Sequence, residues 1–492
     1  MKKFLSDTLF ITIGGLLNRM KGIVFIPFIT AAAGAVNYGA FVLILDNIRM
    51  TKPFASIGLG MGFQRFASAI DKEEKHLLSQ HFFSIFLPTV LFGTLGAGLL
   101  YLLAPLLNEE FFSGKYLAAI QLSSLAVLSN TCFSNVSKFL LARKKFKLYS
   151  VLTLLYELSP YTAFVIGLMI KGEVFWGILC YVITDLFMIS IMVISVVKDL
   201  KMVWPSKLIF MQYFLFSYPL AISEIEGGLL NKVDKYCIGA FMDLNAVAVY
   251  NVIIRACGVI DFVTTPIRKQ MMSYLPKVWD KGFKQESIHT IRQTLLLFLL
   301  ITVGLLTCFT LYMQQILEIF LQEDRPVEQL QLIVLLIGFG IIFSASKRFY
   351  YLLIKLKNQS MDQLIYQLVG VIPNFLLNYL LIPKIGLLGA ALATFVSYAL
   401  ILIVINAKHK LDIDLDFFKH FGSFLIISLS MLLIKELFNF DIDTVWLLIV
   451  SVGISFISYF ALILLLKRSF LLAIKKSFEE FRRITNSNIS NN

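Results

Sequence analysis

The chain has 492 residues, of which 58% are hydrophobic and only 15% are charged, and its mean hydropathy is +0.80. A soluble protein could not cover that much apolar surface with polar side chains, so we predict an all-α polytopic membrane protein. The net charge of +13 is not accompanied by a soluble basic face, which excludes a role in binding nucleic acid.

Apolar segments long enough to cross a membrane follow one another along the whole chain. At about 20 residues per crossing there are about fourteen of them. We predict membrane-spanning helices centred on residues 4–33, 38–66, 79–106, 114–141, 148–170, 174–197, 208–238, 243–271, 293–320, 328–353, 362–382, 386–407, 417–437 and 442–466.

The basic residues of the connectors predict which way the helices cross. Most of them lie at the N-terminus, in every second connector and at the C-terminus. The alternate connectors hold only Lys115, Lys171, Arg325, Lys384 and Lys435. By the positive-inside rule, both termini are cytoplasmic and the alternate connectors face outward.

The second part of the chain repeats the first in the same orientation. Tyr38 and its surroundings match Tyr250 and its surroundings, and the same spacing relates Leu140 to Leu352. Six crossings per unit make the two repeats parallel, and substrates of such proteins bind near mid-membrane between the halves. Chance similarity of Leu/Ile-rich helices is the alternative. We predict a six-helix lobe at 1–207, a second six-helix lobe at 208–410, an additional helix pair at 411–466 and a basic cytoplasmic tail at 467–492.

Ionisable residues interrupt the apolar stretch from Tyr218 to Asp261, where the second lobe begins. Each one costs about 2.5 kcal/mol or more to place at membrane depth, so such residues normally face a wet cavity or one another. This stretch is therefore the leading candidate for a functional site. Its ionisable residues are Glu224, Glu226, Lys232, Asp234, Lys235, Arg255 and Asp261.

Cations concentrate on the first two segments of each lobe. Guanidinium groups bind phosphate oxygens in a bidentate manner, and a low dielectric strengthens the attraction, so the pattern predicts a basic cavity suited to a phosphate. The alternative is internal pairing, for example of Asp46 with Arg49 one turn later. The candidate substrate-binding residues are Arg19, Lys21, Arg49, Lys232 and Arg255.

Motifs for chemistry are absent from the sequence. It has no paired-histidine zinc motif and no nucleophile elbow, and its outward connectors are too short to hold a catalytic domain, so we expect no enzyme activity. The five cysteines all lie in apolar segments, so neither a disulfide framework nor a metal site is expected. Because there is no Walker motif, energy for transport has to come from a gradient or from the membrane potential.

The segment from Lys467 to Arg483 is basic and amphipathic. It places Phe470, Ile474 and Phe478 on one face, with lysines and arginines around them. This pattern predicts an interfacial helix on the anionic lipids of the cytoplasmic leaflet, with a solvated basic tail as the alternative.

Three stretches resemble one known family. The segment from Asn374 to Tyr398, NFLLNYLLIPKIGLLGAALATFVSY, is similar to a recurrent two-helix signature of bacterial polysaccharide-transport flippases. These are the Wzx-type O-antigen exporters of the multidrug/oligosaccharidyl-lipid/polysaccharide superfamily. The pattern from Asp234 to Tyr250 and the NYGAF sequence at Asn37 resemble helix junctions of the same family. The resemblance covers essentially the whole chain.

The resemblance implies a flippase of the bacterial cytoplasmic (inner) membrane. It would move undecaprenyl-diphosphate-linked oligosaccharide, a unit of lipopolysaccharide O-antigen, capsule or a similar surface glycan, from the cytoplasmic to the periplasmic leaflet by alternating access. Arg19, Arg49 and Arg255 would correspond to the cavity arginines of related flippases. Partners implied are membrane lipids, a glycan polymerase and glycosyltransferases.

The resemblance also places the sodium-site positions of related lipid II flippases on Asp234, Asn374, Asn378 and Thr394. A carboxylate is often found where this chain has Asn378, which weakens the case for ion coupling. No cofactor is expected, and coupling to a sodium ion, a proton or the membrane potential is left open. A lipid II flippase is the runner-up, and a multidrug exporter of the same superfamily comes third because a basic cavity suits cationic drugs poorly.

Overall fold

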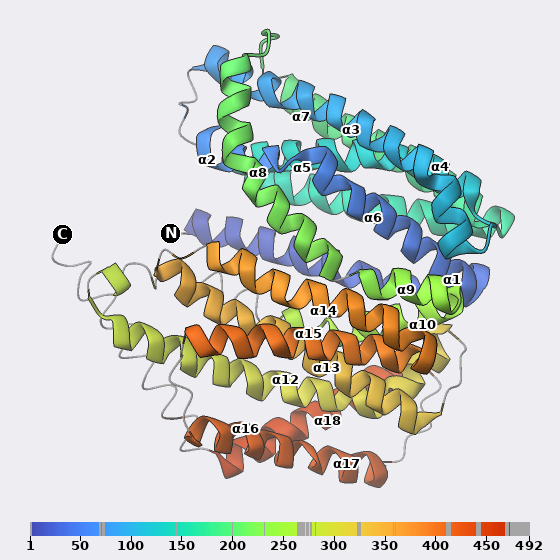
Figure 1. The fold of residues 1–492 in the computed structure, drawn as a ribbon, viewed down its shortest axis with the longest axis vertical. Helices are drawn as coiled ribbons and strands as arrows, with labels where there is room; N and C mark the ends of the chain where they lie inside the picture. The colour runs from blue at the N-terminus through green and yellow to red at the C-terminus, as the bar shows by residue number, and fades with distance from the viewer. Residues whose placement is uncertain are drawn as a thin grey trace. The chain divides into compact units, whose positions relative to one another are not determined.

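The computed structural model describes residues 2–67, 70, 74–143, 145–198, 200–230, 232–262, 271, 275, 278–280, 282–321, 326–357, 359, 361–409, 415–438, 444–467 and 472. Its helices are α1 (Lys2–Ser56), α2 (Leu59–Phe66), α3 (Lys75–Phe112), α4 (Leu117–Ser123), α5 (Leu125–Ala142), α6 (Phe146–Lys171), α7 (Val174–Val197), α8 (Lys207–Leu230), α9 (Val233–Phe241), α10 (Leu244–Cys257), α12 (Lys284–Leu321), α13 (Val327–Leu356), α14 (Met361–Ile385), α15 (Leu387–Lys408), α16 (Leu415–Ser428), α17 (Ser430–Phe438) and α18 (Val445–Leu466) (Figure 1).

Helices occupy every segment predicted to span the membrane. Eleven of the described helices are long and apolar enough to cross a membrane by length and composition, and the described residues contain no strand. The prediction of an all-α polytopic membrane protein is confirmed. The predicted basic tail at 467–492 lies outside the described residues, apart from positions 467 and 472.

The first two predicted spans are the two limbs of α1, which meet at Gly34. Gly34 has φ 80° and ψ 167°, a backbone conformation that is accessible to glycine and strained for other residues. Figure 1 shows the first limb running from the N marker to one end of the unit and α2 lying back toward the other end. A single glycine therefore ends one crossing and begins the next.

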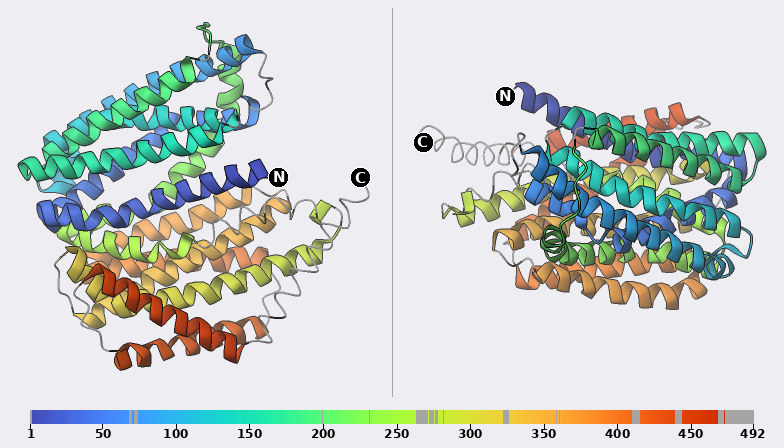
Figure 2. Two further views of the ribbon diagram at one scale, coloured as in Figure 1. Left: turned by 180° about the vertical axis from the view of Figure 1, so that it is seen from behind. Right: turned by 90° about the horizontal axis from the view of Figure 1, so that it is seen from above.

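The chain packs into two compact units, Met1–Asn251 (unit 1) and Val252–Asn492 (unit 2). In unit 1, α1 packs against α3, α5 and α6, and α8 packs against α1, α2 and α3 (Figure 2). Packing thus places residues 208–251 with the first unit. The predicted lobes at 1–207 and 208–410 stay a prediction, since they rest on the sequence repeat.

Unit 1 has an aromatic core in which α2 approaches its neighbours closely. Phe63 of α2 packs edge-on against Phe139 and Tyr213, with ring centroids 5.5 and 5.8 Å apart. Gly62 lies against the same tyrosine, because a Cβ added there would come within 2.5 Å of the ring of Tyr213. Substitution of Gly62 would therefore push α2 away from α8.

In unit 2, α12, α13, α14 and α15 pack side by side, and α16 to α18 cover α12. The hydroxyl of Tyr459 on α18 donates to the carbonyl oxygen of Leu300 at 2.9 Å, and Tyr312 on α12 lies 2.8 Å from the hydroxyl of Ser455. The helix pair predicted at 411–466 is thus held to α12 by hydrogen bonds as well as by apolar packing.

Candidate anion-binding site

The candidate site lies where the seventh predicted span is interrupted. The sequence predicts one helix over 208–238, but α8 ends at Leu230 and α9 begins at Val233. A side-chain oxygen of Asp234 accepts the backbone N–H of Lys235 at 2.8 Å, which satisfies one donor of the new helix start. Broken helices at membrane depth occur where the backbone lines a cavity or is buried in protein.

A buried ion pair joins α9 to the second limb of α1. The ammonium of Lys235 donates to the carboxylate of Asp46, and the two residues are only 5% and 1% exposed. The guanidinium of Arg49 lies 3.5 Å from the other oxygen of that carboxylate. Pairing of Asp46 with Arg49, the alternative considered from the sequence, therefore occurs, but Arg49 shares its acid with a second cation.

Arg49 is held in place by a neutral partner as well. Its guanidinium donates to the hydroxyl of Tyr161 on α6 at 2.9 Å, and its side chain remains 35% exposed. A guanidinium carries five N–H donors, and the contacts to Asp46 and Tyr161 involve only its two terminal nitrogens. Arg49 is therefore both oriented and open to a further acceptor.

Lys232 adds positive charge at the helix break. Its side chain is half buried, and its ammonium makes no hydrogen bond within the described part of the chain. It lies within electrostatic range of Asp46, Arg49, Lys235 and Lys52. We call Arg49, Lys52, Lys232 and Lys235 the basic cluster. The carboxylates in electrostatic range of it are Asp46, Asp234 and Glu157, and Glu157 is already paired with Lys21. The cations therefore outnumber the carboxylates, so the site carries excess positive charge.

Lys21, another predicted binding residue, has its own acid. Its ammonium is paired with the carboxylate of Glu157 on α6 and lies 4.9 Å from the centre of the Tyr161 ring. The side chain of Lys21 is 11% exposed. Glu157 also acts electrostatically on Arg49 and Lys52, which places this pair beside the basic cluster. The positive charge of Lys21 is therefore neutralised more fully than the charge of Arg49 or Lys232.

Hydrogen bonds from tyrosines and asparagines tie the second limb of α1 to α9 and α10 within unit 1. Tyr236 donates its hydroxyl to the side-chain oxygen of Asn47 at 2.7 Å, and the amide of Asn251 donates to the hydroxyl of Tyr38 at 2.6 Å. The approach is closest at Gly39, where an added Cβ would lie 1.9 Å from the carbonyl oxygen of Leu244.

The other two predicted arginines are placed differently. The side chain of Arg19 lies outside the described residues. Arg255 lies on α10 in unit 2, is half buried, and forms no hydrogen bond or ion pair with any described residue. Asp261, an acid of the same interrupted stretch, is paired with Arg348 of α13. The side chain of Glu224 is not among those described.

A family model described as polysaccharide biosynthesis protein matches residues 4–272, more than half of the chain, and these residues include the basic cluster. The chain belongs to the polysaccharide biosynthesis protein family. A putative O-antigen transporter of Shigella flexneri is 25% identical over 186 residues, which cover 37% of this chain and 43% of that protein. An uncharacterized membrane protein of Methanocaldococcus jannaschii is 24% identical over 191 residues, which cover 37% and 36% of the two chains. The matched region thus spans less than half of each relative.

Solved structures show that this polysaccharide biosynthesis protein shares a transporter fold. The lipid II flippase MurJ in an inward closed conformation matches with a TM-score of 0.75 and 15% identity, covering 94% of this chain and 100% of that one. A multidrug resistance MATE family transporter of the MOP superfamily, in an inward-facing conformation, matches with a TM-score of 0.58 and 11% identity, covering 78% and 92%. The predicted resemblance is confirmed for the family by the family model and for the fold by these structures.

The residues predicted for ion coupling in this family member fall in both units. Asp234, in unit 1, is buried and accepts the hydroxyl proton of Tyr250 at 2.7 Å. In unit 2, Asn378 donates its amide to the backbone and side-chain oxygens of Asn374, and both are almost fully buried. Thr394 of α15 is buried against Gly340 of α13. The unit 2 residues offer only neutral oxygens to a cation.

Unit 2 holds a buried cation that was not among the residues predicted from the sequence. Lys347 on α13 is 5% exposed, donates to the side-chain oxygen of Gln367 at 3.0 Å and lies 4.9 Å from the centre of the Tyr398 ring. No carboxylate among the described residues pairs with it. The sequence could have identified Lys347, because Lys347 and Arg348 lie next to each other inside an apolar span. Ionisable residues at membrane depth mark a functional site by default.

Proposed function

We propose that this protein is a flippase for undecaprenyl-diphosphate-linked oligosaccharide, the precursor unit of O-antigen, capsule or a similar surface glycan. The observation that carries the proposal is the excess positive charge of the basic cluster at the break between α8 and α9. A diphosphate offers several anionic oxygens, and guanidinium and ammonium groups bind such oxygens with charge-assisted hydrogen bonds. Within this cluster, Arg49 and Lys232 keep the most N–H donors available for a phosphate oxygen.

The family supports this choice of substrate. The chain belongs to a polysaccharide biosynthesis family, and a relative that matches part of it is named as a putative O-antigen transporter. A lipid II flippase is the second candidate, because the MurJ fold covers nearly the whole chain. A multidrug exporter is less well supported, since a cluster with excess positive charge repels cationic drugs.

Transport by alternating access requires a ligand that binds one conformation better than another. We propose that the anionic diphosphate supplies this difference by drawing cations together, with Arg19, Arg49 and Arg255 as its ligands. The membrane potential supplies energy, because moving one charge through 100 mV is worth about 2.3 kcal/mol. A diphosphate with about two negative charges moving outward gains about twice that, so no cofactor is needed.

The protein is a multi-pass membrane protein. We propose that it resides in the bacterial cytoplasmic membrane with both termini in the cytoplasm, and that glycosyltransferases and a glycan polymerase supply and consume its substrate. We propose no catalytic step. Reporter fusions that are active only in the cytoplasm or only in the periplasm, placed after residues 108, 172 and 199, test this orientation, with activity expected outside for the first two and inside for the third.

Reconstitution tests the proposed transport directly. The purified protein is placed in liposomes containing undecaprenyl-diphosphate-linked oligosaccharide, and a membrane-impermeant oxidant reports how much glycan reaches the outer leaflet. We expect faster exposure than in protein-free liposomes, and a loss of about tenfold or more for Arg49→Ala. Parallel liposomes carry lipid II or a cationic dye. Faster movement of lipid II would favour the second candidate, and movement of the dye alone would overturn the proposal.

A further inference from the structure

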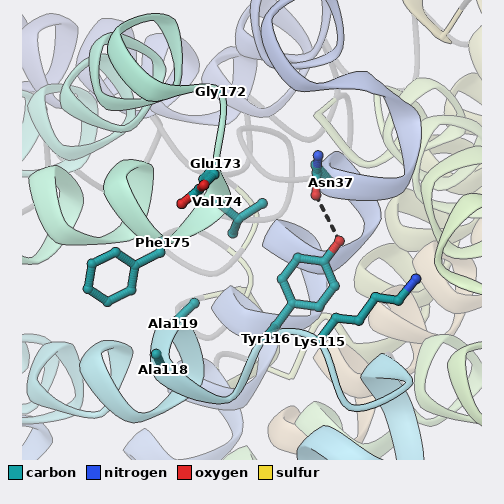
Figure 3. Close-up of a pocket in the computed structure, with 9 residues that line it drawn as sticks. All are labelled: Asn37, Lys115, Tyr116, Ala118, Ala119, Gly172, Glu173, Val174 and Phe175. Atoms are coloured by element: carbon teal, nitrogen blue, oxygen red, sulfur yellow. Dashed lines mark hydrogen bonds between the residues drawn. The ribbon is translucent and has the colours of Figure 1, made fainter.

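A second site lies at the end of unit 1 remote from the N marker of Figure 1. A cavity of about 310 Å³ is built there by the α1 kink region, the start of α4 and the loop between α6 and α7. Figure 3 shows Tyr116 and Phe175 on opposite sides of this space, with Ala118 and Ala119 below and Glu173 above. We call it the outer pocket. All of its walls come from connectors and from the helix ends next to them. The charge pattern predicts that these connectors face outward.

The aromatic wall of the outer pocket is rigid. The hydroxyl of Tyr116 donates to the side-chain oxygen of Asn37 at 2.7 Å, and its backbone N–H donates to the side-chain oxygen of Asn108 at 2.8 Å. Asn37 is itself anchored, because its amide donates to the carbonyl oxygen of Ala33 at 2.8 Å. The position of the Tyr116 ring is thus set before any ligand arrives, which lowers the entropy cost of binding.

The polar wall of the outer pocket is available for hydrogen bonding. Glu173 immediately precedes α7, yet its side chain does not cap the helix and forms no hydrogen bond or ion pair with another described residue. Its carboxylate points toward the space in Figure 3, whereas the ammonium of Lys115 extends away from it. The pocket therefore combines two aromatic side chains with one free carboxylate and the anchored amide of Asn37.

We propose that the outer pocket binds one sugar residue of the glycan on the outer side of the membrane. Sugar rings present apolar C–H faces that pack on aromatic side chains, and hydroxyl groups that donate to carboxylate and amide oxygens. The cavity holds the volume of about ten water molecules, which suits a single sugar residue. The bound sugar is held away from the basic cluster, so the pocket retains the glycan after its diphosphate has crossed.

This inference rests on the proposed function for its ligand, but binding can be measured without transport. The probe is the oligosaccharide released from the lipid carrier by mild acid, which lacks the diphosphate. Saturation-transfer NMR on the protein in nanodiscs reports contact with the sugar protons. Ala118→Trp fills the pocket from an exposed position, Phe175→Ala removes one aromatic wall, and Glu173→Gln weakens the acceptor. Glu109→Gln is the matched control, since Glu109 is exposed near the same end but does not line the pocket.

We expect saturation transfer with the unaltered protein and with Glu109→Gln, and a reduction of at least fivefold with Ala118→Trp and Phe175→Ala. Absence of transfer to the unaltered protein, or undiminished transfer with Ala118→Trp at normal thermal stability, overturns the outer pocket. The liposome assay separates the two proposals. Sugar binding without movement of the lipid-linked glycan would contradict the flippase, whereas normal movement with no sugar binding would contradict only the outer pocket.

Discussion

The ammonium of Lys235 on α9 is bonded to the carboxylate of Asp46 on α1, 189 residues earlier in the chain. Both side chains are buried at membrane depth, where charges without partners are costly. Lys235 shares with Arg49 the carboxylate that Arg49 would otherwise have to itself. It therefore fixes α9 against α1 and leaves Arg49 with capacity for an anionic ligand.

Breaking this pair should destabilise unit 1. We expect Asp46→Asn to lower the stability of the folded protein by about 3–5 kcal/mol, because it leaves Lys235 buried without its acid. Lys235→Met in the same chain should recover most of that loss, since both charges are then gone. Thermal unfolding in detergent measures both variants. No recovery in the double variant would show that Asp46 is needed for another reason.

Arg49 should matter for transport more than for stability. Arg49→Ala removes charge-assisted hydrogen bonds worth about 1.5–3 kcal/mol each, so we expect transport to fall by about 10- to 100-fold. Arg49→Lys keeps the charge without the forked donors and should lie between. Tyr161→Phe, which removes the hydroxyl that accepts from Arg49, should cost less than tenfold. If all three variants transported as fast as the unaltered protein, Arg49 would be excluded from the binding site.

Arg255 should be a functional cation rather than the partner of a buried acid. Arg255→Ala is expected to lower transport at least tenfold at normal membrane abundance. Asp261 is already paired with Arg348, so adding Asp261→Asn should not restore transport. Glu224→Gln is combined with Arg255→Ala in the same way. Full recovery of surface glycan in either double variant would show that Arg255 only neutralises that acid.

The close approach of Gly39 to Leu244 predicts a crosslink. One cysteine introduced within 34–37 and another within 239–245 should form a disulfide in this conformation, because α1 and α10 meet where Gly39 approaches Leu244. If transport requires this contact to open, the crosslinked protein should be inactive and reduction should restore it. Gel mobility reports the crosslink, and the liposome assay reports transport. Full activity in the crosslinked state would contradict alternating access through this end.

Lys347 should be dispensable for folding but not for transport. Lys347→Met keeps the length of the side chain and removes a buried charge that is bonded only to neutral groups, so thermal stability should be unchanged or higher. We expect transport to fall because ionisable residues at membrane depth are kept for function. Lys355→Met, an exposed lysine on the same helix, is the control. Lower stability with normal transport would indicate a structural role.

The sequence by itself determined the class, the helices and the family. Hydrophobicity is a local property, so long apolar segments located the spans, and the boundary between the first two coincides with the kink at Gly34. The cost of charge at membrane depth pointed to Asp46, Arg49 and Lys232 without knowledge of their neighbours. The O-antigen resemblance carried by Asn374 to Tyr398 led to the correct family.

Only the tertiary structure decided which of these groups meet. Asp46 could pair with Arg49 through helix periodicity alone, but its bond to Lys235 depends on how α9 packs against α1 after the break that replaces one predicted helix. The hydrogen bonds of Arg49 to Tyr161 and of Lys347 to Gln367 likewise join different helices. The outer pocket gathers three connectors that are distant in sequence. Such contacts follow from helix rotation and packing, which local hydrophobic patterns do not encode.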